Sequence, residues 1–495
     1  LRESPSGEKQ MFTESNELIE NNMIVEFKYD FAKDGKWRWV PIRVRHDKTA
    51  DFRSGGKNYG NAFHVANSNW HSIHNPITEE MITTGMNIPE QLSDDDVYYN
   101  KMSGPSNTRS LRDFHNLFVK QTLIMAASKR GGTLIDLASG KSGDLPKWIS
   151  AKLKFVFGID VSRDNIENRL DGACARYLNY RKKFRNMPKA LFVVGNSSVN
   201  IRNGDAIVTE KGKQITKAVF GQGPKDIVDL GKGVHAQYAV GESGFDVCSI
   251  QFALHYMLST PESFQNFLRN VSETTKVGGY FIGTCYDGET VFRMLRTTGV
   301  NDSIAIMEQD RKLWEITKRY DNNEFSNNTS SIGYAIDVYQ ESINKTAREY
   351  LVNFTYLTRM LENYGFVLLT REEANEIGLP GSSGMFAELF DQMKDEILRD
   401  KRKKNRYGSA LKMSDYEKRI SFLNRYFIFR KVRDVDAAKV AMSLLNQTIE
   451  EVENDEDAIK RSQEVARLAL AKDAPKKVPR KRGKRIKLQE TGEAS

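Results

Sequence analysis

Five nearly continuous apolar runs constrain the fold of this chain more than any other feature. They are TLIDLA (133–138), KFVFGIDV (154–161), ALFVVGN (190–196), FDVCSIQF (245–252) and GYFIGTCY (279–286). Runs of this kind, separated by helical patterns, are typical of strands in a parallel sheet that helices cover on both faces. Two later runs, FVLLT and RYFIFRKV, can complete the sheet. The sequence therefore predicts an α/β fold between about residues 107 and 432.

The remaining segments have other compositions. Residues 22–80 contain short runs rich in β-branched and aromatic residues and predict a small all-β domain within residues 1–84. Residues 85–106 hold Pro, Gly, Ser and three consecutive Asp residues, as a linker does. Residues 433–472 predict a helical extension with Met442, Leu445, Ile449 and Val452 on one apolar face. Residues 473–495 form a basic, low-complexity tail that is expected to be disordered.

Length, charge and cysteine usage narrow the classes of protein. A chain of 495 residues is long enough for two to three domains, and its net charge of +9 suggests a polyanionic partner. No run of 18 apolar residues is present, so we expect no membrane span. Three widely separated cysteines argue for a reducing compartment and against a cysteine-based zinc site. The chain begins with Leu1 and no apolar signal segment follows, which favours a fragment of a longer protein.

The turn after the first apolar run, in LIDLASGKSGDLPKW, resembles a phosphate-binding loop but cannot form one. That loop needs a glycine five residues before Gly140, where the chain has Ile135 inside a strand. The dinucleotide fingerprint is also missing, because only Gly140 and Gly143 are present. Asp136 and Asp144 flank the turn, and their carboxylates favour a cationic ligand over a phosphate.

A third acidic residue, Asp160, indicates the rest of this ligand. Asp160 ends the second strand, where a carboxylate can accept hydrogen bonds from both ribose hydroxyls of an adenosine. An adenosine that carries positive charge in place of phosphates is S-adenosylmethionine. The turn is therefore predicted to bind this methyl donor.

The fourth strand runs into the segment QFALHYM and predicts the other half of the site. Ligands of open α/β sheets bind at the carboxyl ends of the strands. Gln251, Phe252, His255 and Tyr256 would face that crevice. A cluster of this composition at a strand end is unusual for packing alone.

These segments together carry a specific resemblance. DLASGKSGDLPKW, GIDVS, QFALHY and GGYFIGT occur in this order, preceded by LRDFHNLFVKQTLI, and are similar to the mRNA cap guanine-N7 methyltransferases. The resemblance is strongest to the forms found in multifunctional capping enzymes of large DNA viruses, and it covers about residues 107–432. It implies a class I S-adenosylmethionine-dependent methyltransferase fold, which is Rossmann-like with a seven-stranded, mostly parallel sheet. The implied reaction transfers a methyl group to N7 of the terminal guanine of GpppN-capped mRNA.

The resemblance also implies roles for individual residues. The methyl donor would be held by Lys120, Asp136, Gly140, Asp144, Asp160, Asn196, Ser197 and Gln251. The cap guanine would be held by Phe252, His255, Tyr256, Glu349 and Tyr426. His255, Tyr256 and Glu349 form the catalytic group, in which the first two orient the base and Glu349 stabilises the charge that develops on it. Guanine N7 is unprotonated at neutral pH, so the reaction needs no general base.

The chain departs from the family pattern at several positions. Ala138 and Ser139 replace a Gly-Cys pair, and Ser142 replaces a turn glycine. The family's adenine-reading Asp appears as Asn196, and Asp205 is the rival for that role.

The first domain has a likeness of its own. IVEFKYD followed by WRWVPIRVRHDK resembles the last strands of the OB-fold of a capping guanylyltransferase. The nucleophile motif K-x-D-G is absent from the chain, so guanylyltransferase activity is not expected. The HSIH sequence lacks further ligands nearby, and no metal site is predicted.

Other functions stay open at this point. One alternative is methyl transfer to another acceptor, and a second is a non-catalytic RNA-binding subunit of a capping complex. The expected partners are 5′-capped RNA and upstream capping domains or a stimulatory subunit. The expected location is intracellular, either the cytoplasm (a viral factory), the virion or, from the basic tail, the nucleus.

Overall fold

The computed structural model describes two stretches of the chain. The first covers residues 2–74 with gaps at 4–6, 8, 36, 57–58 and 62, and the second covers residues 108–341 and 343–447. The chain divides into two compact units, Leu1–Ser93 and Asp94–Ser495. The predicted linker, the end of the helical extension and the basic tail lie outside the described residues. Among the helices that are described, none has the length and hydropathy needed to span a membrane.

Within its described residues, the first unit contains two small antiparallel hairpins and two helices. The hairpins pair β1 (Arg2–Glu3) with β2 (Lys9–Gln10), and β3 (Val25–Tyr29) with β4 (Trp39–Val44). The helices are α1 (His46–Arg53) and α2 (Phe63–His74). The two strands predicted from the aromatic runs are confirmed as β3 and β4, but the prediction of an all-β segment is wrong. The stretch after Arg45 lacks the alternating pattern of a half-buried strand, and its backbone hydrogen bonds are satisfied within helices.

The second unit is built on an eight-stranded sheet. Its path of neighbouring strands is β14-β16-β9-β8-β5-β6-β7, and β15 pairs with β16. The strand bounds are β5 Thr133–Asp136, β6 Phe155–Asp160, β7 Lys189–Val194, β8 Phe245–Gln251, β9 Thr275–Tyr286, β14 Phe366–Leu368, β15 Ser383–Met385 and β16 Asn424–Lys431. Strands β5 to β9 pair in parallel, whereas β16 is antiparallel to its three neighbours. The mostly parallel sheet is confirmed, but it has eight strands where seven were predicted, because the short strand β15 also pairs with β16.

Successive residues of the central strands enter two separate hydrophobic cores. Leu134 of β5 packs in one core and Ile135 packs in the other, and both side chains are fully buried. Val247 and Cys248 of β8 divide in the same way. This division is the physical reason why the strands read as continuous apolar runs, since both faces of the sheet are covered.

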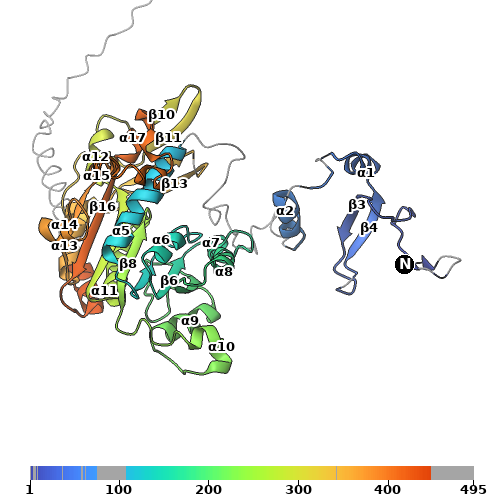
Figure 1. The fold of residues 1–495 in the computed structure, drawn as a ribbon, viewed down its shortest axis with the longest axis horizontal. Coiled ribbons are helices and arrows are strands. Elements are labelled where there is room, and N and C mark those ends of the chain that lie inside the picture. Colours follow the sequence, from blue (N-terminus) through green and yellow to red (C-terminus); the bar gives the residue numbers. More distant parts are fainter. Residues whose placement is uncertain are drawn as a thin grey trace, which may run out of the picture. The chain divides into compact units, whose positions relative to one another are not determined.

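Helices cover both faces of the sheet (Figure 1). One face is covered by α4 (Arg109–Asp113), the π-helix η2 (Phe114–Val119), α5 (Lys120–Ala127), α6 (Leu145–Ser150), α8 (Ala173–Lys183) and α15 (Phe386–Arg399). The other is covered by α9 (Glu210–Val219), α11 (Pro261–Thr274) and α13 (Phe354–Asn363). Further helices of the described residues are α7 Arg163–Glu167, α10 Ile227–His235, η3 Leu254–Leu258, α12 Gly288–Met294, η4 Thr329–Ser331, α14 Arg371–Glu376, α16 Lys403–Arg406, η5 Ala410–Lys412 and α17 Asp415–Ser421.

A second, four-stranded antiparallel sheet was not predicted from the sequence. It consists of β10 (Ser303–Glu308), β11 (Arg311–Lys318), β12 (Ala335–Gln340) and β13 (Lys345–Tyr350), which pair in chain order. Its apolar side chains join the core that also contains the first helix of the unit. This sheet matters for function because Gln340 of β12 and Glu349 of β13 line the cavity described below.

The described part of the C-terminal extension is a helix over residues 437–447. Ala437 and Ala441 are its buried residues, and Met442 is 66% exposed. The apolar face predicted from Met442 is therefore wrong within these residues, because the sheet accepts the small side chains of the neighbouring face instead.

Candidate active site at the carboxyl edge of the sheet

The turn after β5 is bonded to the end of β6. The backbone N–H of Gly140, which has a φ of 51°, donates a 2.7 Å hydrogen bond to Asp160 Oδ2. Asp160 Oδ1 accepts hydrogen bonds from Ser162 N at 3.0 Å and from Asn165 Nδ2 at 2.9 Å. Burial raises the pKa of Asp160, and these hydrogen bonds oppose that shift. The structure thus brings together Gly140 and Asp160, two residues predicted to bind the donor.

Ser142 occupies the turn position at which the family has glycine. Its φ is 54°, in the left-handed region that glycine adopts most easily. The side chain is fully buried, and its hydroxyl has no hydrogen-bond partner among the described residues. The departure noted in the sequence is therefore a strained position in this turn.

We expect Ser142→Gly to stabilise the protein. The substitution removes the strain of the left-handed backbone and the cost of burying an unpaired hydroxyl. Together these gains exceed the entropic cost of ordering a glycine, so the free energy of unfolding should rise by about 1 kcal/mol. Thermal unfolding should show a higher Tm, while Ser150→Gly in α6 should lower it. An unchanged or lower Tm for Ser142→Gly would contradict this account of the turn.

Two lysines approach the carboxylate of Asp144. Lys120 Nζ lies 3.3 Å from Oδ2, and Lys147 Nζ lies 2.8 Å from Oδ1. Burial alone would raise the pKa of Asp144, but the two ammonium groups lower it to about 2. This carboxylate is therefore ionised at neutral pH and sits beside positive charge. A ligand with both a carboxylate and an ammonium group, as an amino acid has, matches this pairing of charges.

Asp136 lies in the same cluster but behaves differently. It is 2% exposed, and burial together with the nearby charge of Asp144 raises its pKa to about 7. Near neutral pH this group is thus only partly ionised. A cationic ligand would favour its ionised form, which fits the prediction that the turn binds a cationic donor.

Three further residues predicted to hold the donor lie at the carboxyl ends of β7 and β8. Ser197 Oγ donates to the carbonyl of Leu137 at 2.6 Å, and Gln251 Oε1 accepts from Thr284 Oγ1 at 3.2 Å. Asn196 is exposed, and its backbone N–H bonds to the carbonyl of Ala206 at 2.9 Å. The structure places all three near the carboxyl ends of parallel strands.

The rival residue Asp205 lies in a separate turn. It is exposed, and its carboxylate accepts a 2.6 Å hydrogen bond from Asn203 Nδ2. Its backbone N–H also bonds to the side chain of Asn203 at 2.9 Å. Asp205 is therefore already engaged within its own loop.

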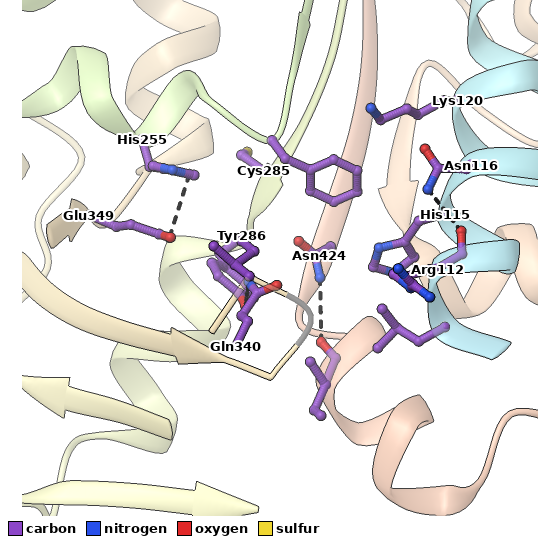
Figure 2. A pocket seen from close by; sticks show the side chains of 14 residues that line it. Arg112, His115, Asn116, Lys120, His255, Cys285, Tyr286, Gln340, Glu349 and Asn424 are labelled. Atoms are coloured by element: carbon purple, nitrogen blue, oxygen red, sulfur yellow. Dashed lines mark hydrogen bonds and ion pairs between the residues drawn. The ribbon is translucent and has the colours of Figure 1, made fainter. Parts of the chain in front are cut away.

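A cavity of about 170 Å³ is lined in part by Lys120 (Figure 2). Side chains from both sheets and from the first helix of the unit line it. They are Leu111, Arg112, His115, Asn116, Lys120, Phe252, His255, Cys285, Tyr286, Gln340, Ile343, Glu349, Ile420 and Asn424. Lys120 belongs to the cavity and also to the carboxylate cluster, so it joins the two halves of the site.

Glu349 and His255 meet at one side of the cavity. They are each 4% exposed, and Glu349 Oε2 lies 3.6 Å from His255 Nδ1. Burial raises the pKa of Glu349 to about 8 and lowers that of His255 to about 3. At neutral pH the pair is therefore mainly uncharged and not an ion pair.

The same pair has unused hydrogen-bonding capacity. Glu349 Oε2 and both ring nitrogens of His255 have no hydrogen-bond partner among the described residues. Buried polar atoms without partners are rare in folded proteins and indicate a place where a ligand binds. The resemblance had implied both residues, and the structure brings them together from segments 94 residues apart.

Phe252 forms another wall of the cavity and is held in a fixed position. Its φ of 57° is uncommon for a bulky residue, and its backbone N–H bonds to the carbonyl of Thr284 at 3.0 Å. His115 stacks on its ring at a centroid distance of 5.0 Å and an interplanar angle of 18°. Backbone strain of this kind clusters at binding and active sites.

The first helix of the unit supplies a polar face of which only Lys120 had been predicted. Arg112, Asn116 and Lys120 are spaced by four residues, and all line the cavity. His115 lies between them in the π-helix η2, a distortion that is frequent at functional sites. The signal was present in the sequence, because Arg112, Asn116 and Lys120 recur every fourth residue, a spacing that places them on one face of a helix.

Another predicted substrate residue, Tyr426, is not among the side chains that line the cavity, and its contact with the substrate stays a prediction. Tyr426 is fully buried in β16 and does not line the cavity. Asn424, two residues earlier on the same strand face, lines it instead. The side chain of Tyr426 packs in the hydrophobic core that covers one face of the sheet.

Tyr256 is also absent from the lining of the cavity. It is half-buried, and its ring contacts that of His255 edge-on at a centroid distance of 4.2 Å. Its contact with the substrate stays a prediction. No group of three or more His, Cys, Asp or Glu side chains able to hold a metal ion occurs in the parts of the chain that the structure describes.

Known proteins resemble this chain along most of its length. "Probable mRNA-capping enzyme" of Acanthamoeba polyphaga mimivirus is 29% identical over 84% of this chain and 37% of its own length. "mRNA cap guanine-N(7) methyltransferase" of Saccharomyces cerevisiae is 26% identical over 65% of this chain and 64% of its own length. The enzyme of the same name from Candida glabrata is 26% identical over 72% of this chain. The chain thus spans less than two thirds of the mimivirus and Saccharomyces proteins.

The sequence profile of the mRNA (guanine-N(7))-methyltransferase domain matches residues 96–432. This stretch contains the whole large sheet, the second sheet and both halves of the site. The fold is that of the class I S-adenosylmethionine-dependent methyltransferases, with a mixed, mostly parallel sheet. The chain belongs to the mRNA (guanine-N(7))-methyltransferase domain family.

Proposed function

We propose that this protein transfers a methyl group from S-adenosylmethionine to N7 of the terminal guanine of GpppN-capped mRNA. One observation carries the choice of acceptor. Glu349 is almost fully buried at the side of a cavity, with an unpaired carboxyl oxygen beside an unpaired, neutral histidine. Guanine offers two donors, N1–H and the exocyclic amine, along one edge, and a carboxylate can accept both.

The donor pocket fits S-adenosylmethionine by its charges. Asp144 and Lys120 match the ammonium and carboxylate groups of the methionine part, and Asp160 lies where the ribose hydroxyls would be. When bound, this donor supplies an electrophilic methyl group on a sulfonium. We assign Asn196 to the adenine edge, because it follows Gly195, whose N–H bonds to the carbonyl of Asp160 at 2.9 Å.

On the acceptor side the protein positions the guanine and stabilises the positive charge that develops on it during the reaction. Phe252 is held rigidly by His115 and offers an aromatic wall for the guanine. Placing the two reactants at attacking distance can supply about 7–11 kcal/mol in favourable cases. As N7 gains the methyl group the guanine becomes cationic, and ionised Glu349 stabilises that charge more strongly than it stabilises the ground state.

Methyl transfer to a defined cap tests this function. The protein is incubated with methyl-tritiated S-adenosylmethionine and GpppA-capped RNA, and nuclease digestion should yield labelled m7GpppA. RNA that already carries m7GpppA is the matched control and should gain no label. Label that appears equally on the control, or at internal nucleotides, would show that the acceptor is another group.

Donor affinity should depend on pH through Asp136. The pKa of this carboxyl is raised to about 7, and a cationic ligand lowers it, so binding releases a proton. Affinity for S-adenosylhomocysteine, which retains the ammonium group, should rise from pH 6 to pH 8. Calorimetry in buffers of different ionisation enthalpy should count the released proton, and Asp136→Asn should abolish the release. A pH-independent affinity would place Asp136 outside the donor site.

We also propose a place for the chain in a larger enzyme. The β3–β4 hairpin and the motif W-x-P-x-R-x-R-x-DK that follows Arg38 support the interpretation of the first unit as the end of a guanylyltransferase OB-fold. The likeness to the mimivirus capping enzyme supports a multifunctional viral capping protein with capped RNA as its partner. Incubation with labelled GTP should leave this chain without covalently bound GMP, since it contains no K-x-D-G sequence.

A further inference from the structure

Tyr286 lines the cavity but was not assigned any role from the sequence. It is the last residue of β9, is 6% exposed and pairs across the sheet with Asn424. Figure 2 shows its side chain between Glu349 and Gln340. The residue thus lies beside the carboxyl group that is proposed to read the guanine.

The hydroxyl oxygen of Tyr286 is already used as an acceptor by two donors. Trp314 Nε1 donates to it at 3.0 Å, and Gln340 Nε2 donates to it at 3.1 Å. An indole N–H can only donate, so the oxygen has to accept in this contact. Both donors come from the second sheet, Trp314 from β11 and Gln340 from β12.

The hydrogen of this hydroxyl is left for another acceptor. No group among the described residues accepts a hydrogen bond from Tyr286. Burial and the nearby carboxyl of Glu349 raise the pKa of the phenol, so the hydrogen is retained at any physiological pH. Two incoming hydrogen bonds also polarise the O–H group and make it a better donor.

We propose that Tyr286 is a specificity-determining residue that donates its hydroxyl hydrogen to O6 of the cap guanine. This inference rests on the proposed function, because it takes guanine as the base in the cavity. O6 is next to N1 on the edge that Glu349 reads. Together, the two residues would read all three positions of that edge, with Glu349 accepting from N1–H and the amine.

The two fixed donors make the contact selective against adenine. Adenine carries an amino group where guanine has O6, so it would present a donor to the hydroxyl hydrogen. Tyr286 cannot reverse its role, because Trp314 and Gln340 occupy the acceptor positions of its oxygen. Binding adenine would therefore bring two donors together and leave buried polar groups unpaired, which is how a polar site rejects the wrong ligand.

The test is a double-mutant cycle on kcat/KM for methyl transfer. The full chain and its Tyr286→Phe variant are each assayed with RNA capped by guanosine, by 6-thioguanosine and by inosine. Sulfur at position 6 is a weak acceptor, whereas inosine lacks only the exocyclic amine. We expect Tyr286→Phe to lower kcat/KM about tenfold with the guanosine cap, mostly through KM.

The loss of kcat/KM caused by Tyr286→Phe should differ between the three caps. With the 6-thioguanosine cap, Tyr286→Phe should cost less than about threefold, since the contact is already weakened. With inosine the loss should stay near tenfold, because the amine and O6 are read by different residues. Tyr320→Phe is the matched control, since it removes another buried hydroxyl that does not line the cavity, and it should leave kcat/KM unchanged.

The assays distinguish failure of this inference from failure of the proposed function. In the first case the parent protein methylates guanosine-capped RNA, and Tyr286→Phe lowers kcat/KM equally with the guanosine and 6-thioguanosine caps. This result would overturn the O6 contact but leave the proposed function intact. A loss below twofold with every cap overturns the O6 contact as well. If the parent protein does not methylate guanosine-capped RNA, the proposed function fails and this inference fails with it.

Discussion

Replacing Glu349 with glutamine is expected to lower kcat/KM for GpppA-capped RNA by about 30- to 1,000-fold. Glutamine keeps the shape of the side chain but removes the charge and turns one acceptor into a donor that faces a donor of guanine. A loss of about 2–4 kcal/mol is the scale of a lost electrostatic contact at a reacting centre. Because the interaction strengthens as the ring becomes cationic, kcat should fall along with kcat/KM. Steady-state kinetics with both substrates varied would measure the two effects.

The pH profile gives an independent check of the same residue. The pKa of Glu349 is raised to about 8, so in the free protein the carboxyl is protonated below that pH and ionised above it. If the ionised form binds guanine, kcat/KM should increase with pH and level off above about 8. Glu349→Gln should lack this increase.

Controls separate the loss of chemistry from the loss of structure. Glu341, directly after β12, is also buried and accepts a hydrogen bond from Thr108 outside the cavity. Glu341→Gln should leave kcat unchanged even if it lowers the Tm. Affinity for S-adenosylhomocysteine should survive in Glu349→Gln. Turnover of Glu349→Gln within about twofold of the parent would show that Glu349 does not read the guanine.

Replacing Asp160 with alanine is expected to weaken the binding of S-adenosylhomocysteine by about 100-fold or more. Two hydrogen bonds from ribose hydroxyls to a charged group are worth about 1.5–3 kcal/mol each, and 1.4 kcal/mol is a tenfold change in affinity. The substitution also removes the acceptor for the N–H of Gly140, so the turn after β5 loses its bond to β6. Calorimetry with the purified variant would measure the loss.

Matched variants make this result specific. Asp160→Asn keeps the size of the side chain and should weaken binding less than alanine does. Asp205→Ala removes the rival carboxylate, which lies in an exposed turn, and should leave affinity unchanged. Unchanged affinity in Asp160→Ala, or a larger loss in Asp205→Ala, would overturn the assignment of the ribose and adenine contacts.

The large sheet and the donor half of the site follow from the amino-acid sequence alone. Strands buried on both faces must be continuously apolar, so β5 to β9 and their place in a mostly parallel sheet could be predicted from the five runs. Parallel strands place their carboxyl ends at one edge, and for that reason the sequence was enough to group Asp136, Gly140 and Asp160. These inferences depend on local periodicity and on a general rule of sheet topology.

The acceptor half of the site depends instead on tertiary contacts. The second sheet has short strands that pair with each other and pack on the core, and its existence depends on long-range contacts that leave a weak local pattern. It brings Glu349 beside His255 and aims two donors at Tyr286, whose role no motif indicated. Burial also depends on the tertiary structure. Tyr426 is enclosed by the core on one face of the sheet, and the pKa of Glu349 is raised because its carboxyl group is removed from water.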